Sequence, residues 1–195
     1  MGIPITALTK LGTEKGTYSP QLHIANENGA CSARSWTWWN ERYLGICVEV
    51  KDDVVVFGSK GIEQNTIRNQ DSIWMVFVNY ETGKEKILYI LPYAAEGKIY
   101  VNMGTEGIMR EMVQIHEEDY NCSIKLRESG YEITLNIPWR LIDIEPREKR
   151  RIGFSVAIND VHDPLARKHR TLIIWEGRTV GGPVRCGKLI LNSSR

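Results

Sequence analysis

The sequence of 195 residues lacks the marks of several protein classes. No apolar run approaches the ~18–20 residues of a membrane span, the first ten residues show no signal peptide, and there is no internal repeat. Its four cysteines form no CxxC pair, so a zinc site is not indicated, and we expect free, mostly buried thiols. They are Cys31, Cys47, Cys122 and Cys186.

Neither charge nor composition indicates a nucleic-acid or membrane partner. Residues 138–195 carry 12 Lys or Arg against 6 Asp or Glu. This excess lies in two basic loops, 147–151 and 167–170, which could bind an anionic polymer or could simply be solvated. No RNA-binding or helix-turn-helix signature supports nucleic acid. Hydrophobic residues make up 42% of the chain, which predicts a folded globular domain.

Short apolar and β-branched segments separated by Gly- and Asn-containing turns dominate the chain. They predict an all-β fold, an antiparallel sandwich of two sheets in a single domain over residues 1–195, with residues 1–29 as an extended lead-in. A helical turn is expected only at residues 138–142. The expected strands are 32–39, 43–50, 54–57, 72–78, 86–91, 99–102, 112–115, 122–126, 131–137, 151–158, 171–175 and 188–191.

The order of seven segments resembles the family-nine carbohydrate-binding modules. The similarity runs from about residue 30 to residue 191 and implies a non-catalytic β-sandwich that binds sugar chains, often beside a secreted polysaccharide-degrading enzyme. It also implies that structural calcium can be present. The segments are Trp39–Leu44, Val48–Asp53, Gln70–Ile73, Tyr131–Ile133, Ile137–Ile142, Ile152–Asp160 and Gly187–Leu191.

The two tryptophans that clamp a terminal sugar in the best-known members of that family are not matched here. Arg68 stands at the first of these positions and Val180 at the second. The resemblance therefore implies the family's fold for this chain but does not imply that sugar clamp.

Six Trp and eight Tyr against three Phe point to rings that face polar surroundings. In the family this chain resembles, Ser35, Thr37 and Trp39 fall on core positions and a Glu stands where Trp74 is. Since side chains alternate along a strand, the resemblance implies that Trp36, Trp38 and Trp74 face away from the core. One interpretation is an exposed sugar platform of these three residues, with Arg68 as a forked donor to hydroxyls or a carboxylate. Residues 1–30 could instead cover the three indoles, or the patch could dock another protein. Trp139 and Trp175 are expected to be structural, with indole N–H groups that tie loops to the sandwich.

Carboxylates at the expected strand ends offer oxygen ligands. Asp52, Asp53 and Asp71 are the candidate calcium ligands, although such residues also form turns. The run 117–119 is interpreted as a solvated loop rather than a glycosidase pair. No histidine is expected to bind metal or to belong to a catalytic triad.

The sequence therefore predicts a carbohydrate-binding module or standalone protein associated with polysaccharide degradation, and not an enzyme. The alternative is an interaction domain whose tryptophan face docks another domain or subunit. By resemblance, the location is extracellular or at the cell surface. Since the chain shows no signal peptide, it could also be an intracellular protein or an excised domain.

Overall fold

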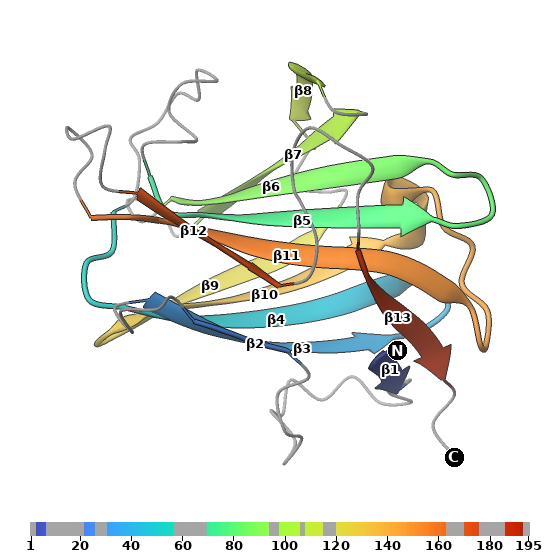
Figure 1. Ribbon diagram of the computed structural model, residues 1–195, viewed down its shortest axis with the longest axis horizontal. Helices are drawn as coiled ribbons and strands as arrows, with labels where there is room; N and C mark the ends of the chain where they lie inside the picture. The colour runs from blue at the N-terminus through green and yellow to red at the C-terminus, as the bar shows by residue number, and fades with distance from the viewer. Residues whose placement is uncertain are drawn as a thin grey trace.

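Two β-sheets face each other in the computed structural model (Figure 1). The structure describes residues 3–6, 22–25, 31–56, 70–93, 98–105, 108–114, 120–162, 170–175 and 186–192. These residues form thirteen strands and one short 3-10 helix, so the predicted two-sheet β-sandwich is confirmed. Among them, no helix has the length and hydrophobicity needed to span a bilayer.

The smaller sheet is antiparallel throughout. Its hairpin β3–β4 turns at Asn40, whose Oδ1 accepts the backbone N–H groups of Arg42 and Tyr43 at 2.8 and 3.0 Å. This turn sets a register that pairs Trp38 with Gly45. In spatial order the strands are β2 (Leu22–Ala25), β3 (Cys31–Trp39), β4 (Tyr43–Asp52), β10 (Gly130–Pro138) and β9 (Asn121–Arg127).

The larger sheet has eight strands, with β11 at its centre. One edge of β11 pairs with β5, and the other pairs first with β13 and then with β12. The strands are β1 (Ile3–Thr6), β13 (Gly187–Asn192), β11 (Arg151–Val161), β5 (Ser72–Asn79), β6 (Glu85–Tyr93), β7 (Lys98–Thr105), β8 (Ile108–Gln114) and β12 (Arg170–Trp175).

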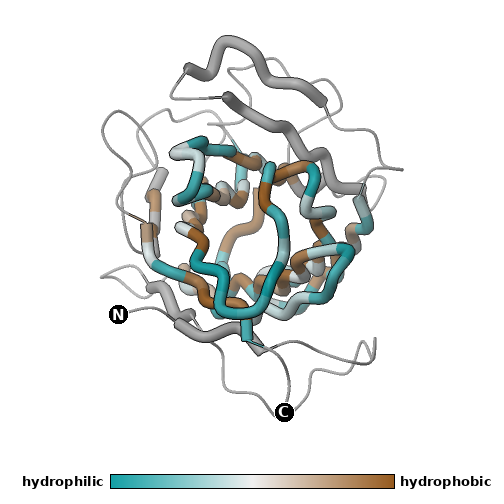
Figure 2. The backbone as a smooth tube through the Cα atoms, turned by 90° about the vertical axis from the view of Figure 1, so that its right-hand side faces the viewer, coloured by the Kyte–Doolittle hydropathy of each residue, from teal (hydrophilic) through white to brown (hydrophobic). Residues whose placement is uncertain are grey.

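The main core fills the space between the two sheets. Seen end-on in Figure 2, hydrophobic segments occur in both layers around a common interior. Side chains of alternating residues enter it, such as Leu44, Ile46 and Val48 from β4 and Ile73, Met75 and Phe77 from β5. Because successive strand residues point to opposite faces, these alternating residues share the inner face of each strand.

Two tryptophans tie chain segments to this core. The indole N–H of Trp139 donates to the Asn40 carbonyl at 2.7 Å, and that of Trp39 donates to the Asn192 carbonyl at 3.0 Å. The expected structural role of Trp139 is thus confirmed. Trp139 opens the 3-10 helix η3 (Trp139–Ile142), the helical turn expected from the sequence.

One expectation about elements was wrong. The described part of segment 54–57, residues 54–56, forms no strand: the chain bends at Val54, whose N–H donates to Asp52 Oδ1 at 3.0 Å. The expected lead-in contains two strands, β1 and β2. Within the antiparallel sandwich, the short strand β1 pairs parallel with β13. Pairing with distant strands gives these short segments their structure, and local pattern does not show such partners.

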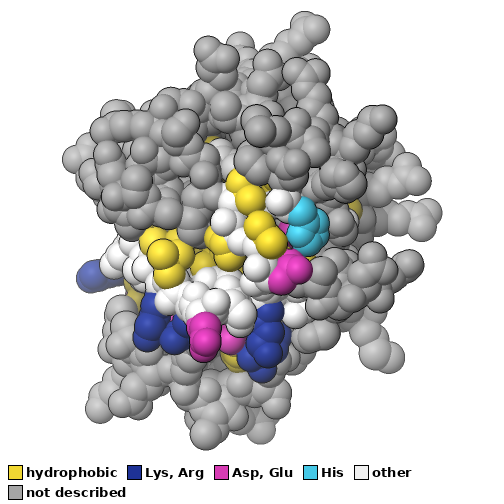
Figure 3. Space-filling model, turned by 90° about the vertical axis from the view of Figure 1, so that its left-hand side faces the viewer, with side chains coloured by type: hydrophobic (Ala, Val, Ile, Leu, Met, Phe, Trp, Pro, Cys, Tyr) yellow, Lys and Arg dark blue, Asp and Glu magenta, His cyan; other side chains and the backbone are white. Residues whose placement is uncertain are grey.

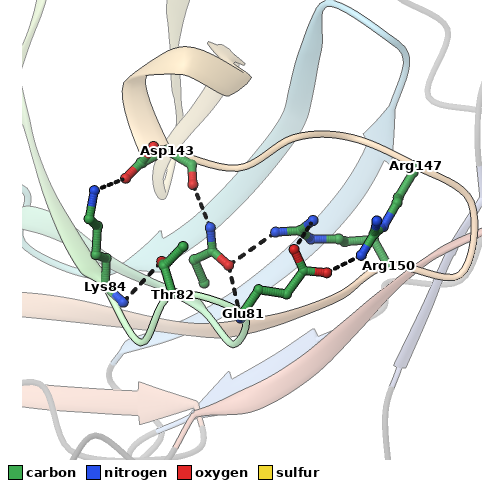
Figure 4. A network of polar contacts seen from close by, with 7 residues as sticks. Glu81, Thr82, Lys84, Asp143, Arg147 and Arg150 are labelled. Carbon is green, nitrogen blue, oxygen red and sulfur yellow. Dashed lines mark hydrogen bonds and ion pairs between the residues drawn. The ribbon is translucent and has the colours of Figure 1, made fainter.

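A polar network joins the β5–β6 turn to the segment after η3 (Figure 4). Asn79 donates to the Asp143 carbonyl at 2.7 Å and accepts from Arg150 at 3.0 Å. Arg150 is buried and lies 2.8 Å from Glu81, which also pairs with Arg147. Part of the basic loop 147–151 is thus held in internal ion pairs. The second basic loop, 167–170, lies almost wholly outside the described residues.

Candidate functional site

The outer face of the smaller sheet carries two tryptophans in line on β3. Burial alternates along this strand, with Trp36 and Trp38 half-buried and their neighbours Thr37 and Trp39 buried. The predicted outward orientation of both indoles is confirmed. Residues two apart on a strand lie about 6.6 Å apart, so the rings form a short row along β3.

Small residues on β4 make room for this row. Gly45 pairs with Trp38 and Cys47 with Trp36. A Cβ atom on Gly45 would overlap the Trp38 indole, so that ring lies directly over the glycine. The missing side chain of Gly45 therefore leaves the space that the Trp38 indole occupies.

Charged and polar side chains border the tryptophan row. The Arg34 guanidinium lies 5.9 Å from the centre of the Trp36 ring and 3.2 Å from Glu49. On β10, the next strand beyond β4, Thr134 pairs with Cys47 and Asn136 pairs with Gly45. The two polar residues therefore lie across β4 from Trp36 and Trp38, respectively. These six residues and Gly45 form what we call the Trp36–Trp38 face: Arg34, Trp36, Trp38, Glu49, Thr134 and Asn136.

Trp74 does not belong to this face. It lies on the outer side of the other sheet, so the predicted single platform of Trp36, Trp38 and Trp74 was wrong. Trp74 is only 3% exposed, packs edge-on against Tyr89 at 5.3 Å, and donates its N–H to Ser72 Oγ at 3.0 Å. A second apolar cluster buries it, comprising Val76, Ile87, Leu91 and Ala157 as well as Tyr89.

Arg68 and Val180 lie outside the described residues, as does the side chain of Trp175. The structure therefore places neither the Arg68 donor nor the two clamp positions. Residues 1–30, proposed as a cover, are described only at β1 and β2.

Acidic residues gather at the end of the sandwich where β3 and β5 begin and β4 and β11 end (Figure 1). Asp52 and Asp71 are buried, and Asp53 is exposed. Asp71 joins three segments, because its two oxygens accept the Val56 and Val161 N–H groups at 2.6 and 2.8 Å. Calcium at these three acids stays a prediction.

Sequence reasoning also considered Asp160 as a strand-end oxygen ligand, but it did not bring Asp52 and Asp160 together with Cys31 and His162. Cys31, Asp52 and Asp160 bring a thiol and two carboxylates within 4.8 Å of one another, and His162 lies 3.4 Å from Asp160. The hairpin register was a usable signal, since counting back from Asn40 pairs Cys31 with Asp52. Figure 3 shows a histidine beside an acidic side chain on this end of the molecule.

Burial controls the electrostatics of this acidic end. It raises the pKa of Asp52 to about 6 and that of Asp71 to about 8, although backbone N–H donors oppose both shifts. Burial also raises the pKa of Asp160, while nearby His162 lowers it. Neighbouring carboxylates add to the raised pKa of Asp52, as expected for like charges in a poorly solvated site.

The family model of the carbohydrate family 9 binding domain-like proteins matches residues 13–194. The chain belongs to this family. It is accordingly a non-catalytic carbohydrate-binding domain. None of the curated proteins compared with this family 9 domain matches it significantly.

Two solved structures share the fold of this family 9 domain. Both are family 9 carbohydrate-binding modules from Caldicellulosiruptor kristjanssonii, one in complex with cellotriose and the other with glucose. The cellotriose complex has a TM-score of 0.64 at 14% identity, covering 100% of this chain and 95% of that one. The glucose complex has a TM-score of 0.60 at 16% identity, covering 98% and 97%.

Proposed function

We propose that this family 9 domain binds a sugar chain on its Trp36–Trp38 face and serves a polysaccharide-degrading system at or outside the cell surface. The observation that carries the proposal is the row of two half-buried indoles beside polar side chains. Indole faces suit the apolar C–H face of a pyranose, while neighbouring polar groups bind its hydroxyls.

Glucose-based oligosaccharides are the proposed ligand class. The two solved relatives hold cellotriose and glucose, and this support comes from family membership rather than from matched site residues. On the Trp36–Trp38 face, one sugar unit would stack on each indole, so the sugar chain would run along β3. Arg34 lies at the Trp36 end, where its guanidinium can donate to hydroxyls or to a carboxylate.

Titration calorimetry with cellotriose and glucose tests the site. We expect Trp36→Ala and Trp38→Ala each to weaken binding by about tenfold or more, because truncating a tryptophan at the centre of a binding surface costs about 2 kcal/mol. Tyr80→Ala is the matched control, since it removes an exposed ring from the β5–β6 turn. Unchanged affinity in both tryptophan variants would place the sugar elsewhere on the domain.

Docking onto another domain or subunit is the competing role of the same face. Solution mass measurements and a glycan array separate the two. A domain that binds no glycan, but forms a dimer that the Trp36→Ala, Trp38→Ala double variant abolishes, would assign the face to docking.

The proposed biological setting is tested with polysaccharides and cells. We expect the domain to sediment with insoluble glucan and to be recovered in the external or surface fraction of its native cells. A purely cytoplasmic distribution would contradict the location while leaving sugar binding intact.

A further inference from the structure

The two sheets contribute metal-ligating side chains to one buried point at the acidic end of the sandwich. Cys31 and Asp52 are paired residues of β3 and β4, while Asp160 comes from β11 in the opposite sheet. Their ligand atoms lie within 4.8 Å of one another, and all three residues are buried. Around a tetrahedral zinc ion, ligand atoms are about 3.3–3.8 Å apart, so a small contraction would suffice.

Asp160 provides independent evidence that a cation belongs at this point. The residue is 0% exposed, and neither of its carboxylate oxygens accepts a hydrogen bond. Buried polar atoms in proteins are nearly always satisfied, and a buried carboxylate without a partner is costly. His162 lies 3.4 Å from Oδ2, outside good hydrogen-bond geometry, so it leaves this carboxylate unsatisfied.

The arrangement of His162 is also typical of a metal ligand. Its Nε2 faces Asp160, while its Nδ1 lies 3.6 Å from Oδ1 of Asp53. Histidines that bind metal usually donate their other ring N–H to a carboxylate. At 3.6 Å this contact is longer than a hydrogen bond, so Asp53 would orient His162 in this way only after the two groups move closer on metal binding.

We propose that Cys31, Asp52, Asp160 and His162 bind one zinc ion that links the two sheets. The ligand types decide between zinc and the calcium suggested by the family resemblance. Calcium takes six to eight oxygen ligands, whereas this group offers a thiol and an imidazole beside two carboxylates, a set suited to zinc. Binding releases the Cys31 thiol proton to solvent, because the thiolate is the ligand.

Cobalt substitution tests the proposal directly. The reduced protein, freed of metal by a chelator, is titrated with Co²⁺ and then with Zn²⁺. We expect a thiolate-to-cobalt charge-transfer band and strong visible bands of four-coordinate cobalt, both abolished by excess Zn²⁺. Zn²⁺ should also raise the melting temperature more than Ca²⁺ does.

Matched variants identify the ligands. Cys31→Ser should abolish the charge-transfer band, and Asp160→Asn should weaken zinc binding by about tenfold or more. Cys122→Ser should retain the band, because Cys122 packs against the main core from β9, outside the ligand group. Circular dichroism verifies that each variant is folded. The absence of the band in the parent protein, its persistence in Cys31→Ser, or stabilisation by Ca²⁺ alone would overturn the proposal.

Discussion

The tryptophans of this domain differ in what their indole N–H groups do. Those of Trp39, Trp74 and Trp139 donate to Asn192, Ser72 and Asn40 within the fold. All three rings are buried, so their N–H groups need such partners. Trp36 and Trp38, which are half-buried on an outer face, are the tryptophans with described side chains that a ligand could stack on.

Gly45 offers a single-atom test of the Trp36–Trp38 face. A methyl group there would overlap the Trp38 indole and push that ring off the sheet. We predict that Gly45→Ala weakens sugar binding about fivefold, or roughly 1 kcal/mol, as measured by calorimetry. In a Trp38→Ala background the same change should have little effect, because the two residues are coupled. Additive losses would show that Gly45 acts independently of Trp38.

At the scale of elements, alternation along a strand shows which side a residue points to but not what covers that side. In β3 the family resemblance assigned Ser35, Thr37 and Trp39 to the core, so alternation correctly predicted the outward Trp36 and Trp38. In β5, Trp74 and Val76 point away from the core and are nevertheless buried. Apolar residues on both faces of β5 and β6 were the available signal, since strands buried on both sides lose their alternation.

The β5–β6 turn depends on Asn79 more than on its exposed ion pairs. Asn79 is buried, and its side chain contacts Asp143, Arg150 and the Glu81 N–H. We predict that Asn79→Ala lowers the free energy of unfolding by about 2–3 kcal/mol, because buried partners lose their hydrogen bonds. Urea denaturation measures this loss.

Lys84→Ala is the control for Asn79→Ala. Lys84 forms an exposed ion pair with Asp143 at 2.9 Å, and such pairs contribute little because water and salt screen them. We expect no measurable change in stability. A larger loss in Lys84→Ala than in Asn79→Ala would contradict the assigned role of Asn79.

At the scale of the whole molecule, two features that sequence could not predict join distant segments. The parallel pairing of β1 with β13 connects the two ends of the chain. Asp160 meets Cys31 and Asp52 only because two sheets stack. Neither contact has a local periodic signal, whereas the sandwich itself follows from short alternating segments and turns.

Burial of acidic groups between the sheets makes the stability of the whole domain depend on pH. The pKa of Asp71 rises from 3.8 to about 8 on folding because the group is desolvated. A carboxyl group with a raised folded pKa binds its proton more tightly in the native state. Its contribution to stability is therefore full below about pH 4 and is lost as the pH rises through about 8.

In the presence of a chelator, the free energy of unfolding should therefore fall between about pH 4 and pH 8. Asp71→Asn should flatten this slope, since an amide mimics the neutral carboxyl group and does not titrate. Glu148→Gln, which removes an exposed carboxylate, should leave the slope unchanged. Urea denaturation at a series of pH values measures all three proteins. A free energy that rises with pH in the parent protein would mean that Asp71 is stabilised as a carboxylate, with its backbone donors outweighing its burial.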